Sequence, residues 1–167
     1  MIAASGIAPA PVSAPLRAAL GRFATGVAVV TTRGLDGRAV GLTVNSVASV
    51  SLDPPLLAWS LSRRTGSLAH FMAARTIAVH VLSDAQEAMA RRFAASPAER
   101  FSGLDVEIGP GSVPLLKDVL ARFLCTLYSG HEAGDHLLLL ARITHWEEFP
   151  GEPLAFYGSR YCRVQRP

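Results

Sequence analysis

The chain has 167 residues, of which 50% are apolar and 17% are charged, and its formal net charge at pH 7 is +3. This length fits a single domain with a buried core. The arginines are scattered along the sequence instead of forming a basic stripe, which argues against nucleic acid as a partner. No apolar run reaches the roughly 18 residues that a membrane span requires, so no membrane partner is expected.

The cysteines and the first residues bear on the cellular compartment. Cys125 and Cys162 are far apart and form no CxxC pair, so we expect reduced core thiols and no metal site. Residues 1–15 are rich in Ala, Pro and Ser and lack the basic start of a secretory signal. We therefore expect a disordered N-terminal tail over residues 1–15, one domain over residues 16–167, and a cytoplasmic location.

The first half of the domain predicts one helix followed by strands. Residues 16–23 carry apolar side chains at helical spacing, with Ser13 or Ala14 as the cap. Residues 27–32 and 38–45 flank a turn that contains two glycines, and this pattern predicts a β-hairpin. Strands are also predicted over residues 43–51, 56–61 and 76–82, with a short helix around residues 68–72.

The second half predicts further short strands. Asp84 is expected to cap a helix in a capping box with Glu87. Residues 106–108 are expected to pair briefly in a sheet, and residues 115–120 to form a short helix or helical turn. Strands are predicted over residues 123–128, 136–149, 154–157 and 161–164, with residues 130–135 as a connecting loop. Many short strands and few helices favour a mainly β fold, an antiparallel barrel with peripheral helices.

Residues 41–55 stand out, because small polar side chains alternate there with apolar ones. Such alternation predicts a strand with one buried face. The polar residues are Thr, Asn and Ser with almost no charge, which suits contact with a flat, hydrogen-bonding ligand. The alternative is an edge strand whose hydroxyl groups face water.

Two other segments have both a functional and an ordinary interpretation. Residues 60–67 combine hydroxyl groups and arginines before a short helix, and a phosphate requires such donors and charge. A solvated turn is the alternative. Neither a Walker motif nor a GxGxxG motif is present. Gly134-Asp135-His136, taken alone, is an ordinary hairpin turn.

Three strings of residues carry a resemblance to a known family. They are Leu20-Gly21-Arg22-Phe23-Ala24-Thr25-Gly26-Val27, the run from Thr43 to Pro55, and Gly134-Asp135-His136. With these motifs in order over residues 16–164, the chain resembles the short-chain flavin reductases of the flavin-binding split barrel. The resemblance implies an antiparallel split β-barrel, a homodimer, and reduction by NADH or NADPH of non-covalently bound FMN or FAD. It also implies a flavin-dependent monooxygenase as the partner that receives the reduced flavin.

The resemblance further implies the residues of the site. The segment expected to line the flavin ring and ribityl chain comprises Thr43, Val44, Asn45, Ser46, Ser49, Val50 and Ser51. The segment expected near the flavin phosphate comprises Ser60, Ser62, Arg63, Thr65 and Ser67. Gly134, Asp135 and His136 are expected on the nicotinamide side. His136 would position the nicotinamide, because hydride passes directly to the flavin and needs no side-chain nucleophile.

The remaining aromatic residues and histidines are less distinctive. The resemblance places Phe93 near the cofactor, although a role in the helix core explains it equally well, and Tyr157 and Tyr161 could border the site or simply pack. His80 occupies a strand position where the family often has Asn, so it could border the flavin phosphate.

Other functions on the same fold are open at this point. One alternative is a non-catalytic flavin- or haem-binding split barrel. Another is an enzyme of the pyridoxamine-phosphate oxidase type, which would need further basic residues in its pocket. The sequence does not separate FMN from FAD, or NADH from NADPH.

Overall fold

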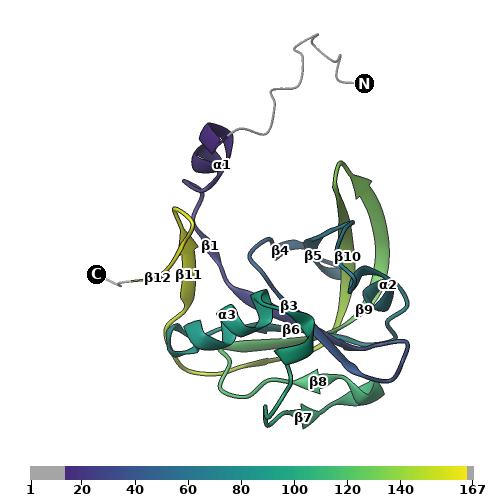
Figure 1. The fold of residues 1–167 in the computed structure, drawn as a ribbon. Helices are drawn as coiled ribbons and strands as arrows, with labels where there is room; N and C mark the ends of the chain where they lie inside the picture. The colour runs from purple at the N-terminus through teal and green to yellow at the C-terminus, as the bar shows by residue number, and fades with distance from the viewer. Residues whose placement is uncertain (1–13, 165–167) are drawn as a thin grey trace.

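The strands assemble into a seven-stranded antiparallel sheet of order β3-β2-β6-β9-β10-β5-β4 in the computed structural model, which describes residues 14–164 (Figure 1). The two end strands, β3 and β4, are consecutive in sequence but do not pair with each other. A smaller sheet of order β1-β11-β12 and a β7-β8 pair complete the strands of the described residues. The expected mainly β, split-barrel architecture is confirmed.

The bounds of the elements are as follows. The strands of the large sheet are β2 (Ala28–Arg33), β3 (Ala39–Val44), β4 (Ala48–Leu52), β5 (Pro55–Ser62), β6 (Ile77–Val81), β9 (Ala121–Ala133) and β10 (His136–Glu148). The other strands are β1 (Thr25–Gly26), β7 (Glu107–Ile108), β8 (Pro114–Leu115), β11 (Leu154–Tyr157) and β12 (Arg160–Arg163). The helices are α1 (Ala14–Leu20), α2 (Leu68–Met72) and α3 (Glu87–Ala94), with 3-10 turns η1 (Asp84–Gln86), η2 (Pro97–Glu99) and η3 (Pro110–Ser112).

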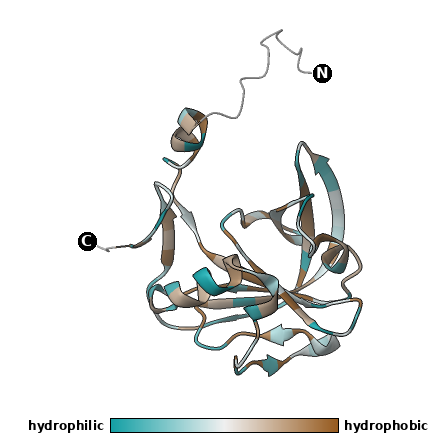
Figure 2. Cartoon of the chain, viewed as in Figure 1, coloured by the Kyte–Doolittle hydropathy of each residue, from teal (hydrophilic) through white to brown (hydrophobic). Residues whose placement is uncertain are grey.

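Three apolar clusters hold the described elements together, and two of them are large. One lies inside the large sheet and contains Trp59, Phe71 and Leu139, each with no exposed surface. The other lies where α3 packs, and is built around Phe93 and Leu82. Apolar segments accordingly fall on the strands and on one side of α3 (Figure 2). Burying one such large side chain stabilises the fold by about 1.5–3 kcal/mol.

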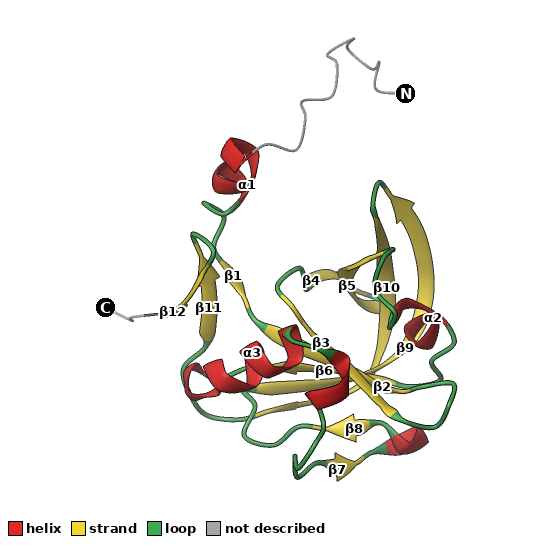
Figure 3. Ribbon diagram, viewed as in Figure 1, coloured by secondary structure: helices red, strands yellow, loops and turns green. Residues whose placement is uncertain are grey.

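The predicted first helix forms, but it packs little against the rest of the described chain. Helix α1 projects from the barrel (Figure 3), and none of its residues is buried. Leu20 is 68% exposed and Phe23, just after the helix, is 79% exposed. Ser13, one of the two proposed caps, lies outside the described residues, as do residues 165–167 and most of the predicted tail.

The prediction of one strand over residues 43–51 is wrong. Strand β3 ends at Val44 and β4 begins at Ala48, and these two strands pair with β2 and β5 respectively. The chain must therefore pass from one end of the sheet to the other at this point, which a continuous strand cannot do. The residues between the two strands include Asn45 and Ser46, which favour turns.

The predicted caps and helix after β6 also differ in detail. The capping box joins Ser83 to Gln86, with the Ser83 N–H donating to Gln86 Oε1 at 3.1 Å, instead of joining Asp84 to Glu87. Residues 116–120 form no helix. The backbone N–H of Leu116 donates to His80 and its carbonyl accepts from Arg122, so these groups are not available to a helix. The expected pairing near Ile108 is confirmed as the β7–β8 ladder.

The β9–β10 hairpin is longer than predicted. Strand β9 continues to Ala133, so residues 130–133 belong to a strand and only Gly134 and Asp135 form the turn. Gly134 has φ +63°, which suits the first position of a tight two-residue hairpin. Strand β10 shows two irregularities in its register with β9, which agrees with the bend expected there.

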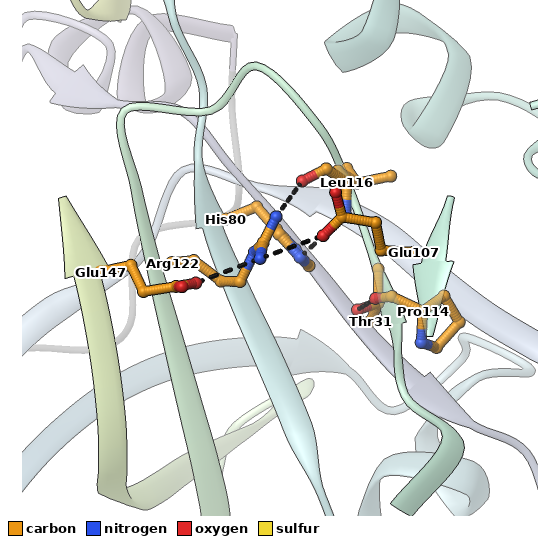
Figure 4. Close-up of polar contacts among 7 residues, drawn as sticks. All are labelled: Thr31, His80, Glu107, Pro114, Leu116, Arg122 and Glu147. Atoms are coloured by element: carbon orange, nitrogen blue, oxygen red, sulfur yellow. Dashed lines mark hydrogen bonds and ion pairs between the residues drawn. The ribbon is translucent and has the colours of Figure 1, made fainter. Parts of the chain in front are cut away.

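His80 lies in the interior and does not border a surface site. Its Nδ1 is 3.0 Å from the carbonyl oxygen of Val29, and the Leu116 N–H donates to its Nε2 at 3.2 Å (Figure 4). An Nε2 that accepts a hydrogen bond carries no proton, so the ring is neutral with its proton on Nδ1. The sequence left open whether His80 points inward or borders a flavin phosphate, and the side chain points inward, with no exposed surface.

The described part of the chain contains no helix that is both long enough and apolar enough to cross a membrane.

The buried His80 predicts a specific loss of stability in acid. Burial lowers its pKa from 6.5 to about 3, so the unfolded state binds a proton in this range and the folded state does not. The contribution of His80 is complete above pH 6.5 and is lost as the pH falls toward 3, with a slope that approaches about 1.4 kcal/mol per pH unit.

Urea unfolding of the wild type and His80→Asn at about pH 7 and about pH 5 tests this prediction. Asn retains a donor and an acceptor but does not titrate. We expect the wild type to lose more unfolding free energy than the variant over this interval. Equal losses would contradict the prediction.

Candidate functional site

Three neighbouring strands, β4, β5 and β10, bring the predicted site segments together. On one edge of β5, Ala58 pairs with Ala48 of β4. On its other edge, Ser62 pairs with His136 of β10. Segments near residues 46, 60 and 136, distant in sequence, are therefore neighbours in the sheet (Figure 1).

A side-chain hydrogen bond continues the β4–β5 contact beyond the end of β4. The backbone N–H of Ser60 donates to Ser46 Oγ at 3.0 Å. Ser46 precedes β4 in the chain, so its hydroxyl takes the place of a strand carbonyl at this position. The hydroxyl of Ser46 thus fixes the residues between β3 and β4 against β5.

The polar side chains of β5 and β10 share one face of the sheet. Directly opposed residues in an antiparallel pair point to the same face, so Ser62 lies beside His136, and Ser60 lies beside Leu138. All four are half-buried. Trp59 on β5 points to the opposite face and has no exposed surface.

A cavity of about 190 Å³ lies at the end of β3. The predicted residues Thr43, Val44 and Asn45 line it, together with Val27, Ala94, Phe156 and Tyr161. The Thr43 hydroxyl donates to the Ala90 carbonyl of α3 at 2.6 Å, and Val44 is buried. Asn45 is the exposed member of the three, so its amide is free to meet a ligand.

Tyr161 contributes an aromatic wall to this cavity. Its ring makes an edge contact with Phe156 at 5.3 Å between centroids, and the Arg91 guanidinium lies 5.1 Å from its centroid. Burial raises the pKa of the Tyr161 hydroxyl. Tyr157 does not line this cavity; it is exposed beside Arg22. Of the two tyrosines considered from the sequence, Tyr161 is the one next to the predicted residues.

The β4 segment carries a bulge that divides its polar residues. Ser49 pairs with Leu57 and Ser51 pairs with Leu56, so Val50 is the extra residue between them. Because Leu57 and Leu56 are consecutive, Ser49 and Ser51 point to opposite faces of the sheet. The expectation that these hydroxyl groups share one face is wrong.

The donor set of this segment nevertheless fits a flavin. Strand β4 is the end strand of the sheet, so one of its edges offers unpaired backbone N–H and C=O groups. The exposed Asn45 amide and Ser49 hydroxyl add short donors and acceptors. Such an alternation of donors and acceptors matches the hydrogen-bonding edge of a flat heterocycle such as the flavin pyrimidine ring.

In the turn that is predicted to bind the phosphate, side-chain oxygens accept hydrogen bonds from backbone N–H groups of the same turn. The Arg64 N–H donates to Ser62 Oγ at 3.3 Å, and the Ser67 N–H donates to Thr65 Oγ1 at 3.4 Å. Helix α2, which follows, has only five residues, and Ser67 makes no side-chain cap. The expected contribution of a helix N-terminus to phosphate binding is therefore not found. The turn has its hydroxyl groups and backbone N–H groups as donors for a phosphate.

Arg100 lies beside this turn and was not identified from the sequence. It lines a cavity of about 230 Å³ with Ser67, Gly41 and His70 among others. Its guanidinium donates to the carbonyls of Gly41 and Ala95, and burial lowers its pKa. Arg100 follows a 3-10 turn far along the chain from Ser67, and no motif links the two residues, so only the fold brings them together.

The turn of the β9–β10 hairpin orients His136. Its Nδ1 lies 2.7 Å from Asp135 Oδ1, and this contact lowers the pKa of Asp135. The Arg63 side chain is directed to the same hairpin, with Nη1 3.2 Å from Glu132 Oε1. The Arg63 backbone N–H also donates to the Asp135 carbonyl at 3.0 Å. The predicted phosphate turn and the predicted nicotinamide triad are thus in direct contact.

Phe93 belongs to the core and does not reach the surface that the other predicted residues line. Its side chain has no exposed surface and makes an edge contact with Phe101 at 4.9 Å between centroids. A Cβ on Gly41 would approach the Phe93 ring to 2.8 Å, so glycine permits this close packing of α3 on β3. The packing role of Phe93 is confirmed, and direct contact with a cofactor is not supported.

The thiols are not part of the site. Cys125 is buried, and burial raises its pKa to about 12, whereas Cys162 is half-buried. Neither forms a disulfide. Within residues 14–164, no group of three or more His, Cys, Asp and Glu side chains gathers in a way that could hold a metal ion.

Comparison with known proteins agrees with the geometry. The Flavin reductase like domain matches residues 20–165. The chain is 41% identical over 154 residues to FMN reductase (NADH) SmoA of Agrobacterium fabrum, covering 92% of this chain and 87% of that protein. It is 34% identical over 150 residues to HsaB of Rhodococcus jostii, the reductase subunit of a flavin-dependent monooxygenase, covering 89% of this chain and 76% of that protein.

A solved structure shows the same fold. The NADH:FAD oxidoreductase SgcE6 of Streptomyces globisporus, in complex with NAD and FAD fragments, matches with a TM-score of 0.84 and 34% sequence identity. The match covers 90% of this chain and 91% of that chain. With nearly the whole described domain matched in sequence and in fold, the chain belongs to the flavin reductase like family.

Proposed function

We propose that this protein is an NADH-dependent flavin reductase that reduces non-covalently bound FMN or FAD and releases the reduced flavin to a monooxygenase. The observation that carries the proposal is the convergence of the predicted flavin and nicotinamide segments on β4, β5 and β10, through the Ala48–Ala58 and Ser62–His136 pairs. The names of the relatives SmoA and SgcE6 support NADH as the hydride donor.

The flavin, when bound, supplies the ring that accepts hydride, and the protein supplies position. The free edge of β4 and the Asn45 amide are suited to hold the pyrimidine edge of the ring. His136, oriented by Asp135, is suited to place the nicotinamide against the flavin. Bringing two reactants together in a fixed orientation accounts for most of the rate that such a reaction needs.

The character of the site also suits release of the flavin after reduction. The residues that we assign to it are hydroxyl- and amide-bearing and largely half-buried or exposed. They offer hydrogen bonds without the dense cluster of charges that would hold a nucleotide tightly. Moderate affinity is what a cofactor that leaves as a product requires.

We further propose a homodimer in the cytoplasm, with a flavin-dependent monooxygenase as the functional partner. The exposed side chains of Leu20 on α1, Phe23 just after it and Leu52 on β4 support the dimer, because large exposed apolar side chains gain from burial against a second copy. The two free cysteines fit a reducing compartment. The HsaB relative supports the monooxygenase partner.

Activity with free flavin tests the proposed function. The purified protein with NADH and either FMN or FAD should oxidise NADH at about 1 per second or faster, as measured by the loss of NADH absorbance. Absence of turnover with NADH and NADPH, for both flavins, would refute the proposal. Flavin binding without turnover would instead indicate a non-catalytic carrier.

Replacement of His136 should affect the nicotinamide more than the flavin. We expect His136→Ala to lower kcat/KM for NADH by about 10-fold to 100-fold, since misplacement of a reactant has effects of this size. The flavin dissociation constant, from fluorescence titration, should change by less than about twofold. His131→Ala is the matched control, because His131 lies on the same hairpin and its Nε2 is 2.9 Å from Ser129 Oγ. Equal losses of flavin binding and turnover would contradict this role.

The phosphate turn predicts discrimination between FMN and riboflavin. We expect Thr65→Ala with Ser67→Ala to weaken FMN binding about 10-fold relative to riboflavin, because only FMN carries the phosphate and hydrogen bonds to charged groups are strong. The ratio of the two dissociation constants is the measurement. Ser67 is only 6% exposed, so its replacement could also lower the stability of the protein, and such a loss would weaken the binding of both ligands equally. An unchanged ratio of the FMN and riboflavin dissociation constants would therefore contradict a phosphate site at this turn.

A further inference from the structure

The residue that we assign to the nicotinamide, His136, directly follows the turn of the β9–β10 hairpin, and the residues just before it are exposed. Strands β9 and β10 continue as a long curved arm beyond β6, whose pairing with β9 ends at Cys125 (Figure 3). Residues 131–135 are all exposed. The ladder between β10 and β5 reaches its last pair at His136 and Ser62, so the turn itself lies just beyond the regular sheet.

Arg63, which lies outside the hairpin, contacts it twice, once at the turn and once on β9. The backbone N–H of Arg63 donates to the Asp135 carbonyl at 3.0 Å. The guanidinium of Arg63 pairs with Glu132, with Nη1 and Oε1 separated by 3.2 Å. Because Arg63 directly follows Ser62, the backbone contact extends the β5–β10 pairing by one step, and the ion pair joins Arg63 to β9 just before the turn.

The direction of the Arg63 side chain bears on its function. From the sequence, Arg63 is expected to bind the flavin phosphate. Its guanidinium instead faces a carboxylate of the hairpin, and the arginine that lines the cavity beside Ser67 is Arg100. An arginine that is already paired with Glu132 would have to break that pair before binding a phosphate.

We propose that Arg63 and Glu132 form a strap that positions His136 for the nicotinamide, and that Arg63 is not a ligand of the flavin phosphate. The inference rests on the proposed function, since it concerns the same site. Arg63 and Glu132 are positioning residues: they hold the turn, the turn fixes Asp135, and Asp135 orients the His136 ring.

The strap also links the two halves of the site. The turn over residues 62–67 would meet the flavin phosphate, and the same segment holds the hairpin that would meet the nicotinamide. Any ligand that orders one end of this segment changes the free energy of ordering the other. Because both partners are partly exposed, with 49% and 74% of their side chains accessible, the effect of the ion pair is expected to be modest and sensitive to salt.

A double-mutant cycle with Arg63→Gln, Glu132→Gln and both together tests the strap. We expect each single variant to raise the KM for NADH about twofold to fivefold at saturating FMN, and the double variant to be no worse than either single one. The difference from the wild type should fade at about 1 M salt. Exchanging the charges, Arg63→Glu with Glu132→Arg, should restore part of the loss.

Two further measurements do not depend on turnover. Amide hydrogen exchange at residues 131–136 should become faster in both single variants. The ratio of FMN to riboflavin dissociation constants should stay within about twofold of the wild type, since the phosphate is held elsewhere. Asp105→Asn is the matched control, because Asp105, 84% accessible, forms a similarly exposed ion pair with Lys117, 42% accessible, away from the predicted site residues.

The possible outcomes separate the two proposals. If Arg63→Gln selectively weakens FMN against riboflavin while Glu132→Gln has no effect, Arg63 is a phosphate ligand and the strap is refuted. If neither variant changes the KM for NADH or the exchange of the turn in an active enzyme, the strap is refuted while the proposed function stands. If the wild type oxidises neither NADH nor NADPH, both proposals fail.

Discussion

Strand β5 is the element on which the rest of the site depends, because it is hydrogen-bonded along both edges and anchored in the core on one face. Trp59 and Leu61 are fully buried on that face, and Trp59 lies opposite the equally buried Leu139 of β10. This alternation leaves Ser60 and Ser62 on the other face. A shift of β5 by one residue would exchange the two faces, so the packing of Trp59 keeps the polar residues on their side.

The second constraint is the attachment of α3 and the following loop to β3. The Thr43 hydroxyl donates to Ala90, Arg100 donates to the Gly41 carbonyl, and the Phe93 ring lies directly over Gly41. Thr43 of β3 and Ala94 of α3 both line the cavity that Asn45 borders. Several residues that sequence motifs mark for a cofactor thus act first as parts of the scaffold, and Asn45 is left to face the open space.

Much of the architecture was predictable from local patterns. The β2–β3 hairpin, the inner strand β5 and the long bent β10 follow from β-branched runs, glycine-rich turns and apolar stretches. The departures share a cause, which is tertiary hydrogen bonding that no local pattern reveals. Residues 116–120 look helical, but His80 and Arg122 take the backbone groups of Leu116. Arg100 could not be predicted either, because tertiary structure alone places it beside the turn over residues 62–67.

The site was predicted more accurately in its composition than in its geometry. The three segments near residues 46, 60 and 136 do meet, as their order in a split barrel implies. Alternation alone assigned the hydroxyl groups of residues 43–51 to one face, and the break after Val44 together with the bulge at Val50 overturns that assignment. The break arises because the chain changes sheet edge after Val44, and neither the break nor the bulge can be predicted from a count of polar and apolar residues.

The bulge at Val50 makes this edge of the barrel tolerant of change at one position. Val50 is half exposed, so many side chains are compatible with its position. Loss of Val50 would restore a regular ladder, and Ser49 and Ser51 would keep their partners Leu57 and Leu56 and therefore their faces. A chain that is one residue shorter at this position should therefore still present the same side chains on each face of β4.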